Sequence, residues 1–326
     1  MKNEPPYKIT NSILNYVGKI TELVTIFEIS RSNIITPKLR KKCLIKTITG
    51  TLQIEGNTLD EEKITAIIEG KRVLATPKEI AEVKGAIELY QKIDIFDYKK
   101  LEDILKAHQI LMKEILINSG KFRDKNVGVG GEKAIVHIAP PSNKVPELME
   151  SLFEWLKNTN IHPLIKSSVF HYELEFIHPF IDGNGRIGRF WQTLILYKWK
   201  PVFGSIPVES LIKENQQEYY EALKISGSLG ESTPFIEFML KIIFDACNGM
   251  LNENVPKKVP RNVPKERLDK IIKLIKENKF ITINEIAEIL KVNSKTIKRD
   301  IAKLKEKGIL KREGSLKTGH WELFED

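Results

Sequence analysis

One stretch of the 326-residue chain, residues 178–189 with the sequence HPFIDGNGRIGR, carries most of the side chains that could do chemistry. His178 has a reference pKa of about 6.5 and suits a general base, and Asp182 suits a magnesium ion that bridges phosphates. Glycines let the backbone N–H groups of this loop converge, and a following helix adds its positive end. Arg186 and Arg189 stand three residues apart, so both leave one face of that helix. Because two cations oppose the helix dipole there, the pattern predicts a bound anion such as phosphate.

These twelve residues match the Fic-family motif, H-x-F-x-[D/E]-G-N-G-R-x-x-R, at every defined position, so the chain resembles a Fic protein. Fic proteins of this kind transfer AMP from ATP to a protein hydroxyl. The resemblance implies that His178 deprotonates the target hydroxyl and that Asp182 holds Mg²⁺. It also implies an ATP site made of Gly183, Asn184 and Gly185 at the α-phosphate and of Arg186 and Arg189 at the outer phosphates. The alternative reading is a plain Gly/Asn turn between two helices.

A second stretch, residues 51–56 with the sequence TLQIEG, places the carboxylate of a glutamate in an electrostatically unfavourable position. Glu55 is expected at the C-terminal end of a helix over residues 39–55, where the dipole opposes a negative charge by roughly 0.3–1 kcal/mol. Such an acid should have a cationic partner. The stretch resembles the Fic inhibitory motif, [S/T]-x-x-x-E-[G/N], whose glutamate pairs with the second arginine of the catalytic motif, here Arg189. The resemblance implies an autoinhibited enzyme; a solvent-facing glutamate in a loop is the alternative.

Helical patterns surround both stretches, and the predicted fold is mainly α: a Fic-type helical bundle with a β-hairpin flap. After a polar N-terminal arm, Pro37 can start the helix that leads to Glu55. Thr58 and Thr76 each open a capping-box pattern for a following helix. A helix over residues 163–176 should stop before Pro179, because the residue before a proline avoids the α region. The apolar residues 190–199 are expected to form the central buried helix.

Residues 120–141 interrupt the helical pattern and predict a β-hairpin. Two valines alternate with glycine before Gly130 and Gly131, which can turn, and residues 135–138 can return. The exposed edge of such a hairpin could pair with an extended peptide, and with GKFR at 120–123 it resembles the Fic flap that holds a target. The candidate docking residues are Val127, Val129 and Val136. A hairpin that only covers the core is the alternative.

Two tyrosines and two histidines complete the set of candidates in this part of the chain. Tyr219 and Tyr220, on an expected helix over residues 215–223, are candidates to flank the adenine of ATP, as in Fic relatives. Packing at the surface is the alternative for both rings. His162 and His171 are expected to serve as helix caps or packing residues rather than as ligands.

The last fifth of the chain holds nearly all of the net charge of +9, because residues 256–326 contain 19 Lys and Arg against 11 Asp and Glu. Prolines mark residues 253–264 as a linker. Residues 265–326 resemble a winged helix-turn-helix, a small α+β domain, with its second helix over 294–307 and a wing formed by 309–312 and 320–323. The resemblance implies that this helix enters the DNA major groove, with outward Lys295, Lys298 and Arg299. Recognition of a protein is the alternative.

The resulting domain division is 1–115 for N-terminal helices with the inhibitory motif, 116–252 for the catalytic core, and then the linker and the basic domain. Two cysteines without metal spacing favour a reducing cytoplasm, and no stretch approaches 18 uninterrupted apolar residues, which argues against a membrane segment. The predicted activity is autoinhibited AMP transfer from ATP, with Mg²⁺, to a Ser, Thr or Tyr hydroxyl of a target protein or of the chain itself. Removal of AMP, transfer of another phosphate-containing group, and an ATP-sensing transcription regulator are the competing hypotheses.

Overall fold

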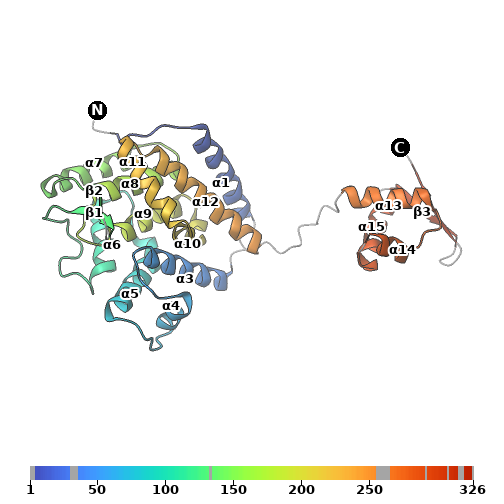
Figure 1. The fold of residues 1–326 in the computed structure, drawn as a ribbon, viewed down its shortest axis with the longest axis horizontal. Coiled ribbons are helices and arrows are strands. Elements are labelled where there is room, and N and C mark those ends of the chain that lie inside the picture. Colours follow the sequence, from blue (N-terminus) through green and yellow to red (C-terminus); the bar gives the residue numbers. More distant parts are fainter. Residues whose placement is uncertain are drawn as a thin grey trace. The chain divides into compact units, whose positions relative to one another are not determined.

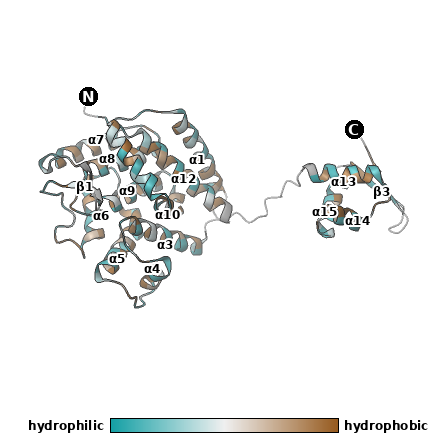
Figure 2. Cartoon of the chain, in the orientation of Figure 1, coloured by the Kyte–Doolittle hydropathy of each residue, from teal (hydrophilic) through white to brown (hydrophobic). Residues whose placement is uncertain are grey.

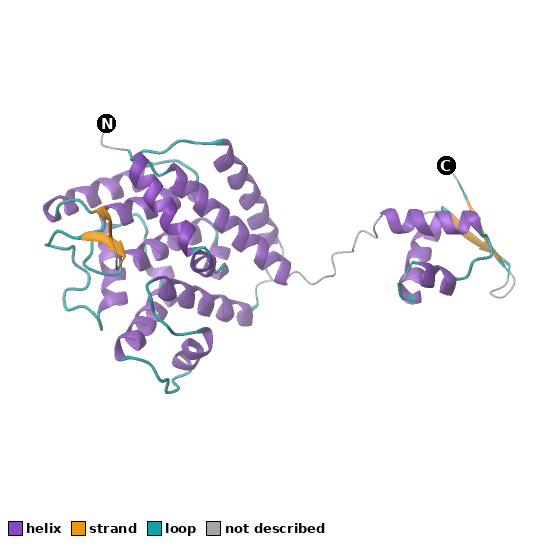
Figure 3. Cartoon of the chain, in the orientation of Figure 1, coloured by secondary structure: helices purple, strands orange, loops and turns teal. Residues whose placement is uncertain are grey.

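The structure, a computed structural model, describes residues 4–29, 36–131, 134–254, 265–290, 292–306, 308–314 and 319–324. The chain divides into two compact units, residues 1–254 and residues 255–326. Helices make up most of the described residues in both units (Figures 1 and 3), and the described strands form two small two-stranded sheets. The prediction of a mainly α protein with a small α+β domain at its C-terminal end is therefore confirmed.

The described part of the first unit is built from α-helices, one hairpin and three short 3₁₀ helices. In chain order they are α1 (Asn11–Ile29), α3 (Pro37–Ile54), α4 (Glu61–Ile68), α5 (Pro77–Gln91), η1 (Ile93–Ile95), α6 (Leu101–Met112), β1 (Gly128–Gly131), β2 (Ala134–Ile138), η2 (Ser142–Lys144), α7 (Val145–Asn158), α8 (Pro163–Ile177), α9 (Asn184–Trp199), η3 (Pro201–Ser205), α10 (Val208–Glu214), α11 (Gln216–Leu229) and α12 (Thr233–Asn254).

The core of this unit forms around α9, the helix that follows the motif loop. Ile187, Phe190, Trp191 and Leu194 are fully buried on it, and α8 packs along its length. The surrounding helices also carry buried apolar residues, and Figure 2 shows hydrophobic and hydrophilic positions interspersed along these helices. Burial of a large apolar side chain contributes about 1.5–3 kcal/mol, so α9 is a firm support for the loop at its N-terminal end.

The sequence predicted a polar arm without regular structure at the N-terminus. This prediction is wrong, because residues 11–29 form the regular helix α1. Its buried residues, Ile13, Ile20, Val24 and Phe27, recur at helical spacing, and α1 packs against α12. The helical spacing of these apolar residues is present in the sequence, but the polar residues between them make it inconspicuous. The segment before α3 is therefore a helix that packs against α12.

Helix caps explain where several of these elements begin. Thr36 accepts a hydrogen bond from the Leu39 backbone at the start of α3, and Thr76 forms the expected capping box of α5. Thr58 does not cap α4; Asp60 does, by accepting from the Lys63 N–H at 2.8 Å. Asp is as good an N-cap as Thr, and the Thr58 hydroxyl donates to Glu79 instead, at 2.6 Å.

The predicted hairpin is present as the antiparallel pair β1–β2. Val129 pairs with His137 and Gly130 pairs with Ile135, so Val136 is an extra residue that forms a bulge in β2. Residues 132–133 at the turn lie outside the described ranges, as do the side chains of residues 129–138.

The second unit contains α13 (Lys265–Glu277), α14 (Ile283–Ile289), α15 (Ser294–Glu306) and the antiparallel pair β3 (Leu310–Glu313) and β4 (His320–Leu323). Its core is a cluster of mainly aliphatic side chains closed by Trp321, whose indole N–H donates to Ile281 O at 2.8 Å. Buried Asp300 on α15 accepts from Arg267 Nε at 2.8 Å, which ties α15 to α13. The expected helix-turn-helix with a two-stranded wing is therefore confirmed.

Candidate active site

His178 ends α8 in a left-handed backbone conformation, with φ 50° and ψ 61°. It is the one non-glycine residue with positive φ in the described part of the chain, and Pro179 excludes the ordinary α region there. The predicted helix stop is therefore confirmed. Such strained conformations are found where surrounding contacts impose them. The buried Nδ1 atom of His178 has no hydrogen-bond partner among the described residues. Burial lowers the pKa of the imidazole.

Arg123 supplies the contacts that impose this conformation. Its Nε donates to His178 O at 2.7 Å and its Nη2 donates to Ile177 O at 3.3 Å, while its own N–H donates to Pro179 O at 2.9 Å. The guanidinium also donates to Pro140 O at 2.6 Å, just after β2. One buried side chain thus joins the flap to the loop that carries the candidate base. The sequence placed Arg123 in a Fic-like GKFR stretch without assigning it this role.

Asn184 and His108 brace the other side of the loop. The Asn184 side chain accepts from the Phe180 N–H at 2.9 Å and donates to Phe180 O at 2.8 Å. His108 Nδ1 accepts from the Gly120 N–H at 2.8 Å, so its Nε2 carries the proton that it donates to Asp182 O at 2.9 Å. The His108 ring stacks on Phe180 at 3.8 Å. Burial lowers the pKa of His108 to about 4, which keeps the imidazole neutral.

The start of α9 has the properties of a phosphate site. The first amide that bonds within the helix is that of Ile187, to Gly183 O, so the preceding N–H groups of the first turn have no helical partner. Gly183 has φ 86°, a conformation that favours glycine. An added Cβ at Gly185 would lie 2.4 Å from Glu55 Oε1 and 2.9 Å from Arg189 Nη1, so this ion pair lies directly against the start of α9. Backbone donors and the helix dipole converge there on an anion.

Asp182 is the carboxylate at this point, and 41% of its side chain is exposed. Its Oδ1 accepts from the Gly183 N–H at 2.6 Å and from Arg186 Nη2 at 2.9 Å. The described residues contain no group of three or more His, Cys, Asp or Glu side chains able to hold a metal ion. Mg²⁺ commonly binds through one or two carboxylates plus substrate phosphates, and Asp182 is a partly exposed carboxylate of this kind.

Arg189 is held by α3. It donates from Nη2 to Glu55 Oε1 at 2.6 Å, from Nε to Thr51 Oγ1 at 2.9 Å and from Nη2 to Thr51 O at 3.2 Å. The Arg189 side chain is 1% exposed and that of Glu55 is 31% exposed. Burial by itself lowers the pKa of Arg189, but Glu55, Tyr219 and Glu175 together outweigh this effect and raise the pKa above its usual value. The structure therefore brings Thr51, Glu55 and Arg189 together.

Arg186 is held by a second acid that the sequence reading missed. Its Nη1 lies 3.2 Å from Glu82 Oε1 on α5, and Glu82 also accepts from Asn57 Nδ2 at 2.8 Å. Buried Arg186 Nε has no hydrogen-bond partner among the described residues. Glu82 sits on the inward face of α5. Acidic residues are rarely buried without a partner, so an acid placed among the inward apolar positions of this helix was the signal that the sequence offered.

The two candidate adenine residues are placed differently. The Tyr219 side chain is buried, at 1% exposure, beside Phe235, and its hydroxyl lies 3.1 Å from His171 Nε2. Its expected role is corrected to core support, because the ring has no free face for a base. Tyr220 is 47% exposed and its hydroxyl lies 3.4 Å from Ile54 O, so it stays a candidate. His162 caps α8, as expected.

The remaining candidates stay predictions. Val127 is partly buried in front of β1, and the side chains of Val129 and Val136 lie outside the described part. Lys295, Lys298 and Arg299 are all exposed on α15. Among the described residues, no helix is both long and apolar enough to cross a membrane.

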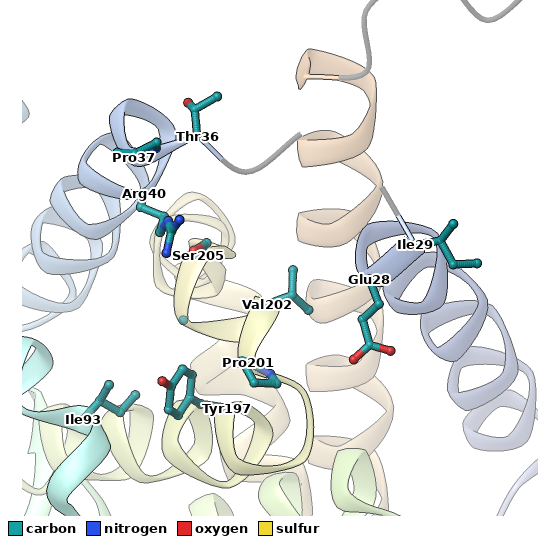
Figure 4. Close-up of a pocket in the computed structure, with 11 residues that line it drawn as sticks. Glu28, Ile29, Thr36, Pro37, Arg40, Ile93, Tyr197, Pro201, Val202 and Ser205 are labelled. Atoms are coloured by element: carbon teal, nitrogen blue, oxygen red, sulfur yellow. The ribbon is translucent and has the colours of Figure 1, made fainter. Parts of the chain in front are cut away.

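A cavity of about 710 Å³ lies away from the motif, between α1, α3, α9 and η3. Figure 4 shows Glu28, Arg40 and Tyr197 around it. Tyr197 is 13 residues after Asn184 on α9, which corresponds to about 20 Å along the helix. We assign this cavity no role.

Comparisons with known proteins agree with this geometry. A sequence model of the Fic/DOC family matches residues 97–196, and one of the DeoR-like helix-turn-helix domain matches residues 267–314. Protein adenylyltransferase Fic of Drosophila erecta is 30% identical over 226 residues. That match covers 65% of this chain and 42% of the Drosophila protein, so the chain spans about two fifths of that relative.

Solved structures extend the comparison to the whole chain. Fic-1 from C. elegans, at 21% identity, has a TM-score of 0.60 over 74% of this chain and 72% of that chain, which shows a shared fold. A crystal structure of a Fic family protein from Desulfovibrio desulfuricans G20 has a TM-score of 0.75 and 38% identity, and covers 99% of both chains. With this relative and with the motif folded as described, the chain belongs to the Fic family.

Proposed function

We propose that the protein is an autoinhibited protein adenylyltransferase that transfers AMP from ATP to a Ser, Thr or Tyr hydroxyl of a protein, including its own chain. The observation that carries the proposal is the contact between Glu55 and Arg189 at 2.6 Å, beside an intact loop with His178 and Asp182. The Drosophila relative named as an adenylyltransferase supports the choice of AMP. We place the protein in a reducing cytoplasm, where its two cysteines, Cys43 and Cys247, are both buried.

In the proposed reaction the hydroxyl oxygen of the target attacks the α-phosphorus of ATP. A bond forms between these two atoms, the bond from the α-phosphorus to the bridging oxygen breaks, and pyrophosphate leaves with its electron pair. His178 takes the hydroxyl proton; the lowered pKa keeps it neutral at pH 7 and able to do so. Backbone N–H groups at the start of α9 stabilise the charge on the phosphate. Mg²⁺, held by Asp182 and the phosphates, would supply further charge compensation.

Inhibition follows from the position of Arg189. While Glu55 occupies this guanidinium, the γ-phosphate of ATP has no partner there and the α-phosphorus is misaligned to the hydroxyl. A misplacement of about 1 Å lowers the rate on the order of 10²-fold. The Arg189 side chain is 1% exposed, so a phosphate reaches this guanidinium only after Glu55 moves away from it.

The test is incubation of the Glu55→Gly variant, with Mg²⁺, with ATP labelled at the α or at the γ position. Protein label from the α position alone supports AMP transfer. Label from the γ position would show phosphate transfer and contradict the proposal. Release of label from a pre-AMPylated protein by wild type would favour a second function, AMP removal, in which the partly exposed Glu55 carboxylate positions a water.

For the C-terminal unit we propose binding of duplex DNA through α15, supported by exposed Lys295, Lys298 and Arg299 and by the DeoR-like match. Each phosphate contact steepens the slope of log affinity against log salt by about 0.9. In the full chain, Lys298→Ala with Arg299→Ala is expected to flatten the slope by nearly two. Absence of DNA binding at low salt would assign this unit to protein recognition.

A further inference from the structure

The end of α3 carries Glu55, and side chains from the α10–α11 region hold the carbonyl groups of this end. Lys213 Nζ donates to Gln53 O at 2.9 Å, and Gln216 Nε2 donates to Ile54 O at 2.9 Å. Lys213 also donates to Gln216 Oε1 at 2.7 Å, which fixes the orientation of that amide. Carbonyl groups at a helix C-terminus lack intrahelical partners, and the dipole favours a cation there. The two donors therefore satisfy the last turn of α3.

The body of α3 lies directly against α10. An added Cβ at Gly50 would lie 2.6 Å from backbone atoms of Glu209 and Ser210, so the two backbones are in contact. Ser210 Oγ donates to Lys46 O at 2.9 Å, and buried Glu209 accepts from Thr47 Oγ1 at 3.2 Å. The body of the helix is thus fixed by close packing. In the last turn Leu52 and Ile54 are buried as well, and the long, partly exposed side chains of Lys213 and Gln216 add hydrogen bonds to its carbonyl groups.

We infer that Lys213 and Gln216 are positioning residues for the inhibitory contact. They hold the last turn of α3 where Glu55, the residue after its final helical position, reaches Arg189. Neither side chain forms a hydrogen bond with Arg189. Both act through the backbone carbonyl groups of residues 53 and 54. This inference deepens the proposed function and rests on it: loosening the last turn should release Arg189 and raise AMP transfer.

The experiment compares the full chain with Lys213→Met and Gln216→Met, using α-labelled ATP at one concentration. Loss of one such hydrogen bond is expected to raise the population of the displaced helix end, and hence transfer, about three- to tenfold. The matched control is Lys224→Met, an exposed lysine of α11 that lies 3.7 Å from Glu221. This control should transfer AMP at the wild-type rate.

Two further measurements separate positioning from a general structural effect. With Glu55→Gly already present, Lys213→Met should give no additional rise, because no inhibitory carboxylate remains to be displaced. Hydrogen exchange should become faster in Lys213→Met at the amides of Gly56 and Asn57, which bond to the carbonyls of Gln53 and Leu52.

Unchanged transfer and exchange in Lys213→Met, or an equal change of transfer in both backgrounds, would overturn the inference while leaving the proposed function intact. A different outcome would contradict the proposed function alone. This is the case in which the Glu55→Gly variant transfers no more AMP than wild type. In that case the exchange measurement decides the positioning role by itself. Faster exchange supports it and unchanged exchange overturns it.

Discussion

The motif loop and the end of α3 meet in one site but are held in different ways. The loop is fixed from both sides by the buried side chains of Arg123, His108 and Asn184, which bond to its backbone. The end of α3 reaches α9 through buried Thr51 and through the side chain of Glu55, which is partly exposed. A backbone held in this way keeps its shape when a neighbour leaves, and such preorganisation favours catalysis. We therefore expect that loss of the Glu55 contact leaves the geometry of the motif loop unchanged.

Replacement of His178 is expected to have the largest effect, and this effect should be on the rate of AMP transfer rather than on ATP binding. In the Glu55→Gly background, His178→Ala should lower AMP transfer about 10²–10⁴-fold, the usual contribution of a general base, with ATP–Mg²⁺ affinity unchanged by calorimetry. Asp182→Ala should instead weaken metal-dependent binding. Because burial lowers the pKa of His178 and the neutral form is the active one, the acid limb of the rate profile of the parent should lie below pH 6.5. Parental transfer in His178→Ala would show that another group is the base.

Arg123→Met tests the brace of the loop. It leaves several backbone carbonyls without their donor, so we expect the free energy of unfolding to fall by about 3 kcal/mol and transfer in the Glu55→Gly background to fall about 10²-fold. Urea unfolding and the labelled-ATP assay measure the two effects. Lys121→Met, an exposed neighbour, is the matched control. If Arg123→Met keeps the parental rate, the loop does not depend on this brace.

His108 gives a smaller, pH-dependent effect. Its pKa is about 4 in the folded chain and about 6.5 when unfolded, so the unfolded chain binds more protons between these values. The free energy of unfolding should therefore fall as the pH drops from about 6.5 to about 4, by up to about 3 kcal/mol for this residue. In His108→Gln the fall should be smaller by that amount, measured by urea unfolding at several pH values. An identical pH dependence in both proteins would contradict the assigned environment.

The sequence predicts what depends on local pattern. Helix ends next to Pro37, Thr76 and Pro179, the hairpin and the winged helix-turn-helix all follow from capping, turn chemistry or period. Helix α1 was missed although its apolar residues have helical spacing, because the polar residues between them dominated the reading. Thr58 was given a cap that Asp60 provides, since both residues suit that position.

Site contacts that depend on tertiary packing were beyond the sequence. Glu82 reaches Arg186, and Arg123 reaches His178, across long separations in the chain. Tyr219 and Tyr220 are adjacent, and nothing local reveals which ring turns into the core. Residues that bind the backbone of another element have no spacing rule, because their partners are carbonyl groups that every residue carries.

The most direct test of the account compares self-directed AMP transfer in wild type, Glu55→Gly, Arg189→Ala and the double variant at one ATP concentration. The account predicts that Glu55→Gly exceeds wild type by about 10²-fold, with little change in stability, and that both proteins with Arg189→Ala stay low. Equal transfer in wild type and Glu55→Gly would contradict it, because the ion pair between Glu55 and Arg189 would then have no part in restraining the enzyme.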